Sequence, residues 1–239
     1  MRYLDLTLPF PEENLACDEA LLDLCEEDGA DEVLRFWEPK QYFAVVGYGN
    51  EAVREVNLSF CEANDIPVLR RCTGGGTVLQ GPGCLNYCLI LRIGDSGPLH
   101  SISSTNEFIL RRHQEALTEV LGKPVEMCGQ TDLAIGGLKF SGNAQRRKRQ
   151  CLIFHGSFLL DFDIKLIAQA LPMPSKQPDY RRERAHGDFL MNLEVPAELV
   201  KRALIEAWKA SEILAGVPFA RIGALVHEKY GRAGWIRDH

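Results

Sequence analysis

The sequence predicts an α+β fold in which a mixed or mostly antiparallel sheet is flanked by helices. Apolar runs typical of strands alternate, although not strictly, with segments of helical spacing, and short turns separate several neighbouring strands. The chain has 239 residues, of which 46% are hydrophobic and 25% charged, so it has enough apolar material for a buried core. These observations favour an α+β domain over a doubly wound parallel sheet.

Short apolar runs between turn residues mark the expected strands. The strands are expected at residues 3–8, 33–37, 43–47, 67–71, 85–91, around 125, 133–135, 138–144 and 151–160. Pro9 and Pro11 end the first strand, and a turn at Glu38-Pro39-Lys40 predicts a hairpin between the second and third. The run at 85–91 is nearly all apolar, which is typical of a buried strand.

Helical spacing of apolar residues marks the expected helices. They are expected at residues 14–25, 58–64, 105–121, 164–171, 196–214 and 224–230, with 196–214 the longest. Asn14 is suited to cap the first helix, while Gly122 and Pro124 end the third. The segments 48–56 and 94–99 are expected to be loops, and 172–184 a connection across the surface.

Charge and cysteine content narrow the function classes. The formal net charge of -6 argues against broad nucleic-acid binding, which usually needs a basic face. The 8 cysteines include no CxxC pair, so we expect buried thiols in a reducing compartment rather than a disulfide framework or a zinc site. We see no secretory signal and no membrane-spanning apolar run, and therefore expect a cytoplasmic protein without membrane partners.

A glycine-rich stretch is the first candidate for chemistry. Gly74, Gly75 and Gly76 follow directly on Arg70-Arg71-Cys72-Thr73. Three glycines expose backbone N–H groups without a Cβ, and the two arginines add positive charge, so the stretch is suited to bind an anion. A plain turn between two strands would also explain the glycines.

The second candidate stretch runs from Asp132 to Gln145. Lys139 lies between two apolar residues, so its aliphatic part can be partly buried while its ammonium meets an anion; a solvated edge lysine is the alternative. Ser141, Gly142 and Asn143 follow with a hydroxyl, an open backbone and an amide, as a polar ligand requires. His155-Gly156-Ser157 closes another strand. A structural hydrogen-bonding role is the simpler interpretation of the histidine.

The order of these motifs along the chain resembles that of the lipoate-protein ligase A family, which belongs to the biotin/lipoate protein ligase superfamily. An arginine pair before a Thr-Gly-Gly-Gly loop and a later Lys-x-Ser-Gly-x-Ala strand carry the resemblance. It extends over most of the chain through Asn14-Leu15-Ala16 with Glu19, Val45-Val46-Gly47, Glu55-Val56-Asn57, Leu85-Asn86-Tyr87, Asp132 and His155-Gly156-Ser157. The resemblance implies the biotin/lipoate ligase catalytic fold and ATP-dependent attachment of lipoate or octanoate to a carrier lysine.

The resemblance also implies roles for individual residues. Lys139 becomes the catalytic cation between the carboxylate and the α-phosphate. The residues expected to bind nucleotide and acyl group are Arg71, Gly75, Gly76, Thr77, Val78, Leu79, Asn86, Asp132, Lys139, Ser141, Gly142, Asn143, Ala144 and His155. Asp132 either accepts from the adenylate or holds Mg²⁺, unless it only opens a strand. The residues expected to line an acyl channel, if not simply core, are Val78, Leu79, Tyr87 and Leu89.

Partners follow from the same resemblance. The acyl acceptor is expected to be a lipoyl-carrier protein, of the H-protein or acyltransferase-subunit lipoyl-domain type. The basic groups Arg146-Arg147-Lys148-Arg149 and Arg181-Arg182-Arg184 would steer such a domain or meet phosphates, or simply be solvated.

Two departures from the family pattern bear on the mechanism. Gln80-Gly81 stands where many members carry His-Asp, and we expect residues 1–239 to form one catalytic domain without the C-terminal accessory domain of the larger ligases. Either a separate polypeptide supplies that part, or the enzyme works without it, or it does not use ATP.

The alternatives are a transferase that takes octanoyl from a carrier thioester, with Cys128 as the nearest nucleophile, and a non-catalytic lipoate- or carrier-binding module. Biotin ligase is less favoured, because the stretch from Lys139 follows the lipoate pattern.

Overall fold

The computed structural model describes residues 1–27, 29–94, 96–174 and 176–237. Its larger sheet has the strand order β11-β1-β2-β6-β10-β9-β8-β7, and a smaller sheet has the order β4-β3-β5. The strands of the larger sheet are β1 (Arg2–Asp5), β2 (Val33–Trp37), β6 (Cys84–Arg92), β7 (Glu126–Cys128), β8 (Asp132–Ile135), β9 (Leu138–Arg147), β10 (Cys151–Leu159) and β11 (Glu212–Ile213). The smaller sheet contains β3 (Phe43–Val46), β4 (Val68–Arg70) and β5 (Val78–Gln80).

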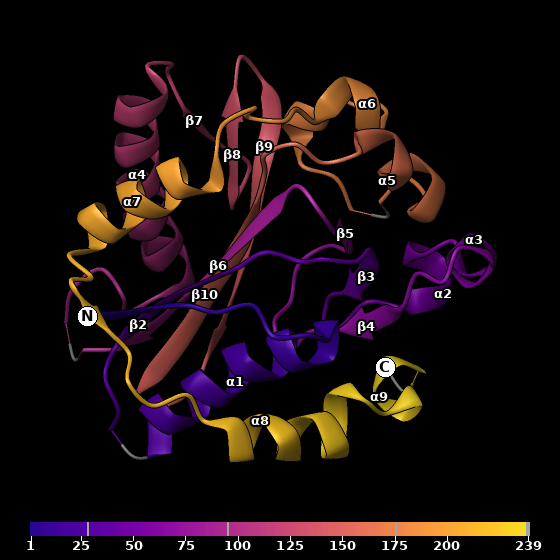
Figure 1. Cartoon of the computed structure of the whole chain (residues 1–239). Helices are drawn as coiled ribbons and strands as arrows, with labels where there is room; N and C mark the ends of the chain where they lie inside the picture. Colours follow the sequence, from indigo (N-terminus) through magenta and orange to yellow (C-terminus); the bar gives the residue numbers. More distant parts are fainter. Residues whose placement is uncertain (28, 95, 175, 238–239) are drawn as a thin grey trace.

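Helices cover both faces of the larger sheet (Figure 1). Helices α4 (Ile102–Leu121) and α7 (Ala197–Trp208) pack on one face, and α1 (Pro11–Glu27) with α8 (Phe219–Leu225) on the other. The remaining helical segments are α2 (Ala52–Glu55), α3 (Leu58–Ala63), α5 (Ile164–Ala170), η1 (Asp179–Arg181), α6 (His186–Phe189), the π-helix η2 (Val226–Tyr230) and α9 (Ala233–Arg237). The α+β class with a mixed, mostly antiparallel sheet is confirmed.

Alternation along β6 and β10 divides the core between the two faces. Leu85, Tyr87 and Leu89 belong to the cluster under α4 and α7. Cys88 and Ile90 belong to the cluster under α1. Because both faces of these strands are covered, nearly every position is apolar, which is why the run at 85–91 was recognisable as buried from the sequence.

Several expected elements differ from the structure. The hairpin at residues 33–47 is wrong, because β2 pairs with β1 and β6 while β3 pairs with β4 and β5 in the other sheet. Asn14 lies inside α1 instead of capping it, and its amide holds the backbone of Leu8 and Phe10. The expected loop at 48–56 contains the short helix α2.

The C-terminal elements also differ from expectation. The helix expected at 196–214 ends at Trp208, because Lys209 is left-handed with φ 52° and the chain then adds β11 to the sheet. Helix α4, with 20 residues, is longer than α7, with 12. The short helix expected at 224–230 is the end of α8 followed by η2.

The cysteine prediction holds in part. Cys25 at the end of α1 and Cys151 at the start of β10 form a disulfide across 126 residues, which corrects the expectation of thiols throughout. Within the described residues the free cysteines are Cys17, Cys61, Cys72, Cys84, Cys88 and Cys128, and all but the half-buried Cys128 are buried.

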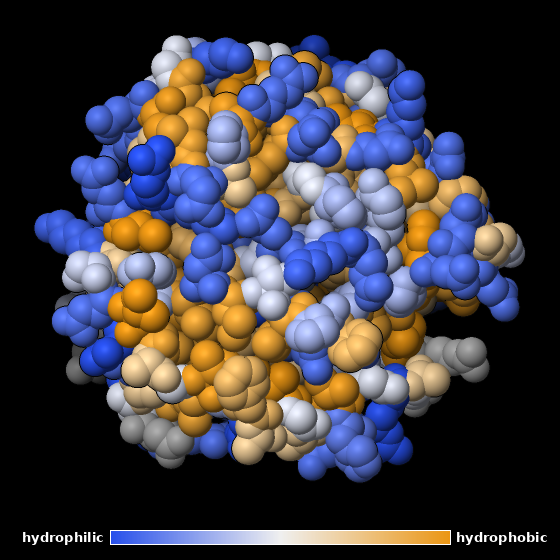
Figure 2. Space-filling model, in the orientation of Figure 1, coloured by the Kyte–Doolittle hydropathy of each residue, from blue (hydrophilic) through white to orange (hydrophobic). Residues whose placement is uncertain are grey.

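Apolar and polar side chains alternate over the surface, with more apolar area in the lower half of Figure 2, where α8 lies in Figure 1. A groove of about 460 Å³ lies between α8 and the segment before α1, lined by Leu8, Pro9, Phe219, Ile222 and Val226. Within the described ranges, none of the helices combines the length and apolar character needed to cross a membrane.

Candidate active site

A β-bulge determines where the Lys139 side chain points. Leu133 on β8 pairs with Ser141, but the next residue, Ala134, pairs with Lys139, so Phe140 is an extra residue in β9. Regular alternation would place Lys139 on the same face as Ser141; the bulge puts it instead opposite Ala134, on the face of Asp132. Phe140 meanwhile enters the core under α4.

The Lys139 ammonium is fixed on the α1 side of the sheet. Its Nζ lies 2.8 Å from Oδ1 of Asp132, and the two side chains are 26% and 11% exposed. It occupies the space that a side chain at Gly142 would fill, because a Cβ there would approach Nζ to 2.8 Å. Gly142 and Asp132 are register partners, so the ion pair lies directly over β8 and β9.

The glycine loop lies beside this ion pair on the same face. A Cβ built on Gly75, whose φ is 90°, would lie 3.5 Å from the Ala144 Cβ, and Ala144 is two residues from Gly142 on β9. Two strand residues span roughly 7 Å. Gly74, Gly75 and Gly76 are exposed, so their backbone is open to a ligand. The structure therefore brings together a fixed cation and an accessible glycine backbone.

The arginine pair before the loop holds the protein's own backbone. Arg71 is buried and donates from its guanidinium to Gly74 O and Gly76 O, both at 2.7 Å. Burial lowers the pKa of Arg71 to about 10. Arg70 is fully buried and donates to carbonyls of Gly47, Tyr48, Asn50, Trp235 and Ile236. The prediction that both arginines supply free charge for an anion is wrong for Arg70, and Arg71 shapes the loop.

His155 fastens the loop to the sheet. Its Nε2 lies 2.7 Å from Oγ1 of Thr73, and its Nδ1 lies 3.7 Å from Oδ2 of Asp18 on α1. Asp18 also pairs with the buried Arg35. Burial opposes ionisation of Asp18, but Arg35 and His155 outweigh it and lower the pKa of the carboxyl. His155 thus connects a buried ion pair with the first residue of the glycine loop, and Ala144 is its register partner on β9.

One row of residues across the sheet contains unsatisfied donors. By register, Asp132, Gly142, Ser157, Asn86 and Trp37 follow one another across β8, β9, β10, β6 and β2. Asn86 Nδ2 and Trp37 Nε1 are buried and have no hydrogen-bond partner among the described residues. A buried donor without a partner is costly, so this end of the row is suited to meet a polar ligand or water. Sequence reasoning missed Trp37, which looked like an ordinary strand residue.

Other candidates point away from this face. Asn143 accepts from the Tyr87 hydroxyl and donates to Thr131 O, on the α4 side of the sheet, and Ser141 lies beside it. Their side chains serve the fold, and their backbone lies in β9 between β8 and β10, where Asn143 O also accepts from Thr131 Oγ1. Thr77 lies behind the glycines on the approach to β5, and its Oγ1 is buried without a partner in the described residues.

The prediction that Val78, Leu79, Tyr87 and Leu89 together line an acyl channel is wrong. Tyr87 and Leu89 lie in the cluster under α4. Leu79 packs with β3 and α5, and Val78 against the cluster under α1. These side chains occupy three separate clusters, so together they cannot line one channel.

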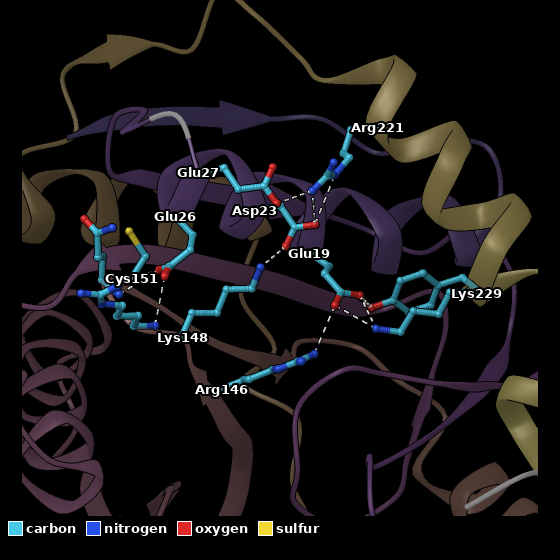
Figure 3. Close-up of polar contacts among 12 residues, drawn as sticks. Glu19, Asp23, Glu26, Glu27, Arg146, Lys148, Cys151, Arg221 and Lys229 are labelled. Carbon is cyan, nitrogen blue, oxygen red and sulfur yellow. Dashed lines mark hydrogen bonds and ion pairs between the residues drawn. The ribbon is translucent and has the colours of Figure 1, made fainter.

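The basic groups named from the sequence are largely tied to the fold. On the α1 side of β9, Arg146 and Lys148 pair with Glu19 and Asp23, as Figure 3 shows. Glu19 also accepts from Lys229 and Tyr230 of η2, so this carboxylate links the C-terminal segment to α1 and, through Arg146, to β9. Arg181 is buried, whereas Arg182 is exposed.

This fold, with its glycine loop and lysine strand on one face of a mixed sheet, is of the biotin/lipoate ligase catalytic type. The chain belongs to the lipoyl protein ligase A/B catalytic domain family, whose model matches residues 10–208. Its fold is that of the bi-partite lipoate protein ligase from Thermoplasma acidophilum, with a TM-score of 0.82 at 22% identity over 98% of this chain and 94% of the other. Lipoate-protein ligase A bound with ATP gives 0.82 at 23% identity, covering 99% and 98%.

Curated relatives carry two kinds of name. A probable lipoate-protein ligase A of Mycoplasma pneumoniae is 29% identical over 84% of this chain and 60% of its own length. A lipoate–protein ligase 1 of Staphylococcus aureus is 32% identical over 55% of this chain. An octanoyltransferase LipM of Brevibacillus brevis is 28% identical over 75% of this chain and 73% of its own. The chain spans 39% and 60% of the length of the two ligases.

Proposed function

We propose that this chain attaches lipoate or octanoate to a lysine of a lipoyl-carrier domain, using ATP to form an acyl-adenylate. The observation that carries the proposal is the Lys139 ammonium, held by Asp132 over Gly142, on the same face as the exposed glycine backbone at Gly75. A fixed cation beside open N–H groups suits two anions that must meet, a carboxylate and an α-phosphate.

The proposed mechanism uses these groups in order. The glycine backbone binds the phosphate, and Lys139 lies between the phosphate and the incoming carboxylate, reducing their repulsion and stabilising the charge that develops as they react. Asp132 keeps the ammonium in place, so little reorganisation is needed during the reaction. Asn86 Nδ2, at the same row of the sheet, is an unsatisfied donor for the acyl head or the nucleotide.

Magnesium fits this site only as a companion of the triphosphate. The described residues contain no cluster of three or more His, Cys, Asp or Glu side chains that would hold a metal by themselves. Asp132 offers a single carboxylate, and Mg²⁺ is commonly bound through one or two carboxylates plus substrate phosphates. When bound there, the ion would neutralise phosphate charge.

The second candidate is transfer of octanoyl from a carrier thioester. The LipM relative favours it, because this chain covers 73% of that protein. It requires an activated thiol, which means a lowered thiol pKa. Burial instead raises the pKa of each free cysteine in the described residues, and Glu126 and Asp132 raise that of Cys128 further. We therefore favour the ligase.

The partner is proposed to be a lipoyl-carrier domain, of the H-protein or acyltransferase-subunit type. The archaeal lipoylation system that contains the bi-partite ligase also contains its E2 lipoyl domain, and the two-part ligase supports testing a separate accessory polypeptide here. We further propose that the chain works as one catalytic domain. Among the described residues six unpaired thiols stand against one disulfide, and this excess of thiols supports a cytoplasmic setting.

Carrier mass tests the proposal. The purified chain is mixed with a lipoyl-carrier domain and either octanoate with ATP and Mg²⁺ or an octanoyl-carrier thioester. We expect a mass gain from the free acid, and Lys139→Ala to slow it by about 100-fold or more. Lys165→Ala, on the exposed side of α5, is the matched control.

Labelling only from the thioester, abolished in Cys128→Ser, would establish the transferase instead. No gain from either donor, with or without an added accessory polypeptide, would favour a binding module.

A further inference from the structure

Tyr180 reaches the active site from a part of the chain that sequence reasoning treated as a surface connection. It lies in η1, within the segment that joins α5 to α6. This segment crosses beside β8 and β9, where Arg184 donates to Gly137 O at 3.0 Å. Just after α6, Met191 N donates to Lys139 O at 2.9 Å. Tyr180 is thus anchored next to the strand that carries Lys139.

Tyr180 completes the hydrogen bonding of Asp132. Its hydroxyl donates to Oδ2 at 2.8 Å, while Oδ1 faces the Lys139 ammonium at 2.8 Å. A carboxylate bound at both oxygens cannot rotate freely about its terminal torsion, which is otherwise soft. Burial, followed by the charge of Asp132, raises the pKa of Tyr180, so the hydroxyl stays protonated and remains a donor.

The chain holds Tyr180 in this position at a conformational cost. Gly129 is left-handed with φ 56°, and a Cβ there would crowd Pro178 at 3.2 Å and the Tyr180 ring at 3.5 Å. The next turn contains two consecutive left-handed residues without a glycine, Arg182 with φ 51° and Glu183 with φ 58°. Such conformations are unfavourable for residues that carry a Cβ and persist where surrounding contacts fix them. Arg184 supplies one such contact, donating to Tyr180 O at 3.0 Å.

We propose that Tyr180 is a positioning residue for Lys139, acting through Asp132. Its hydroxyl fixes the carboxylate, and the carboxylate holds the ammonium over Gly142, where it faces the glycine loop. The effect on turnover rests on the proposed function, whereas the effect on the lysine itself does not. Tyr180→Phe removes one oxygen and keeps the ring packing on Phe189, whose ring centroid is 5.2 Å away.

A double-mutant cycle tests whether Tyr180 acts through Asp132. Tyr180→Phe is expected to lower kcat for acyl-adenylate formation about 10-fold with little change in KM, because positioning is lost rather than binding. In an Asp132→Asn background it should lower kcat no further. Tyr42→Phe, which keeps the edge contact of that ring with Phe162, is the matched control and should leave kcat unchanged. Equal losses in both backgrounds would overturn the proposal.

Chemical labelling of Lys139 gives a second test of the proposal, which does not depend on enzyme turnover. The free protein is acetylated with limiting acetic anhydride, and modification of Lys139 is measured by mass spectrometry relative to exposed Lys165. We expect Tyr180→Phe and Asp132→Asn to raise the Lys139 ratio several-fold, equally and not additively. An unchanged ratio in Tyr180→Phe overturns the proposal, even if the chain proves to have no ligase activity; an inactive wild type with the expected labelling overturns only the proposed function.

Discussion

Gly142 leaves open the space that the Lys139 ammonium occupies. A Cβ at this position would meet Nζ at 2.8 Å and Cε at 3.0 Å, and both atoms belong to the flexible end of a side chain. Gly142→Ala should therefore move the ammonium without disturbing the sheet. We expect a loss of kcat of about 100-fold, typical of a misplacement near 1 Å, with a change in unfolding free energy below about 1 kcal/mol.

The measurement is kcat for carrier acylation together with urea unfolding. Gly187→Ala is the control, because an added Cβ there would have no neighbour within 4 Å. Full activity in Gly142→Ala would mean that the ammonium is not needed where the structure holds it.

The sequence predicted a residue as part of the site when its type was unusual for its expected secondary structure. Lys139, Asp132 and the glycines stood out because charge and glycine are uncommon beside strands. Trp37 did not, since aromatic residues are ordinary in strands. Tyr180 gave no such signal, because a tyrosine beside arginines is ordinary in a surface connection and its contact with Asp132 joins residues 48 apart. The neighbouring Arg181 is itself buried and donates to Arg184 O. The roles of Trp37 and Tyr180 as hydrogen-bond donors depend on contacts between segments that are distant in the chain, and the spacing of residues along the sequence does not encode such contacts.

At the scale of elements, the larger helices and the buried strands followed from periodicity, while pairing did not. A turn between residues 37 and 43 is compatible with a hairpin, yet the two strands enter different sheets. The helix expected to reach 214 ends at Trp208, because the sheet edge at β1 offers backbone partners for β11. Edge pairing is a tertiary gain that outweighs local helical propensity.

Arg70 joins elements that lie far apart in the chain. Its guanidinium donates hydrogen bonds to backbone carbonyls of the loop after β3 and of α9. In return, Trp235 Nε1 donates to Arg70 O at 2.8 Å. Arg70→Met removes these donors and leaves the buried carbonyl of Gly47 and the part-buried carbonyls of its other partners without them. We expect a loss of unfolding free energy on the order of 3 kcal/mol.

Urea unfolding measures that loss, and hydrogen exchange of residues 233–237 shows whether α9 is released. Arg54→Met is the control, since Arg54 pairs with Glu51 on the surface. A loss of stability with unchanged exchange in α9 would contradict the role of Arg70 as the link to the C-terminal segment.

At the scale of the whole molecule, His113 makes stability depend on pH. It is fully buried on α4, and Trp208 Nε1 donates to its Nε2 at 2.8 Å. Burial, followed by Arg112, lowers the His113 pKa from 6.5 to about 3. Below pH 6.5 the unfolded chain binds a proton that the folded chain does not, so stability falls as pH decreases toward 3.

Between pH 7 and pH 5 this amounts to about 2 kcal/mol, at 1.36 kcal/mol per pH unit below 6.5. We expect His113→Gln to remove that part of the pH dependence, measured as the difference between urea unfolding free energies at the two pH values. His100→Gln, at an exposed position, should keep it. An identical slope in His113→Gln and wild type would contradict the prediction.

The extra residue at Phe140 has a consequence for comparing relatives of this chain. A motif aligned letter by letter scores the lysine, the serine and the glycine, but it does not register on which side of the sheet each emerges. Insertion of one residue between Leu133 and Ala134 in β8 would give Phe140 a partner and restore regular alternation. It would keep every letter of the motif while turning the ammonium to the Ser141 face, toward the core beneath α4. Whether a relative is an enzyme or an inert homologue can therefore depend on an insertion of one residue rather than on any substitution.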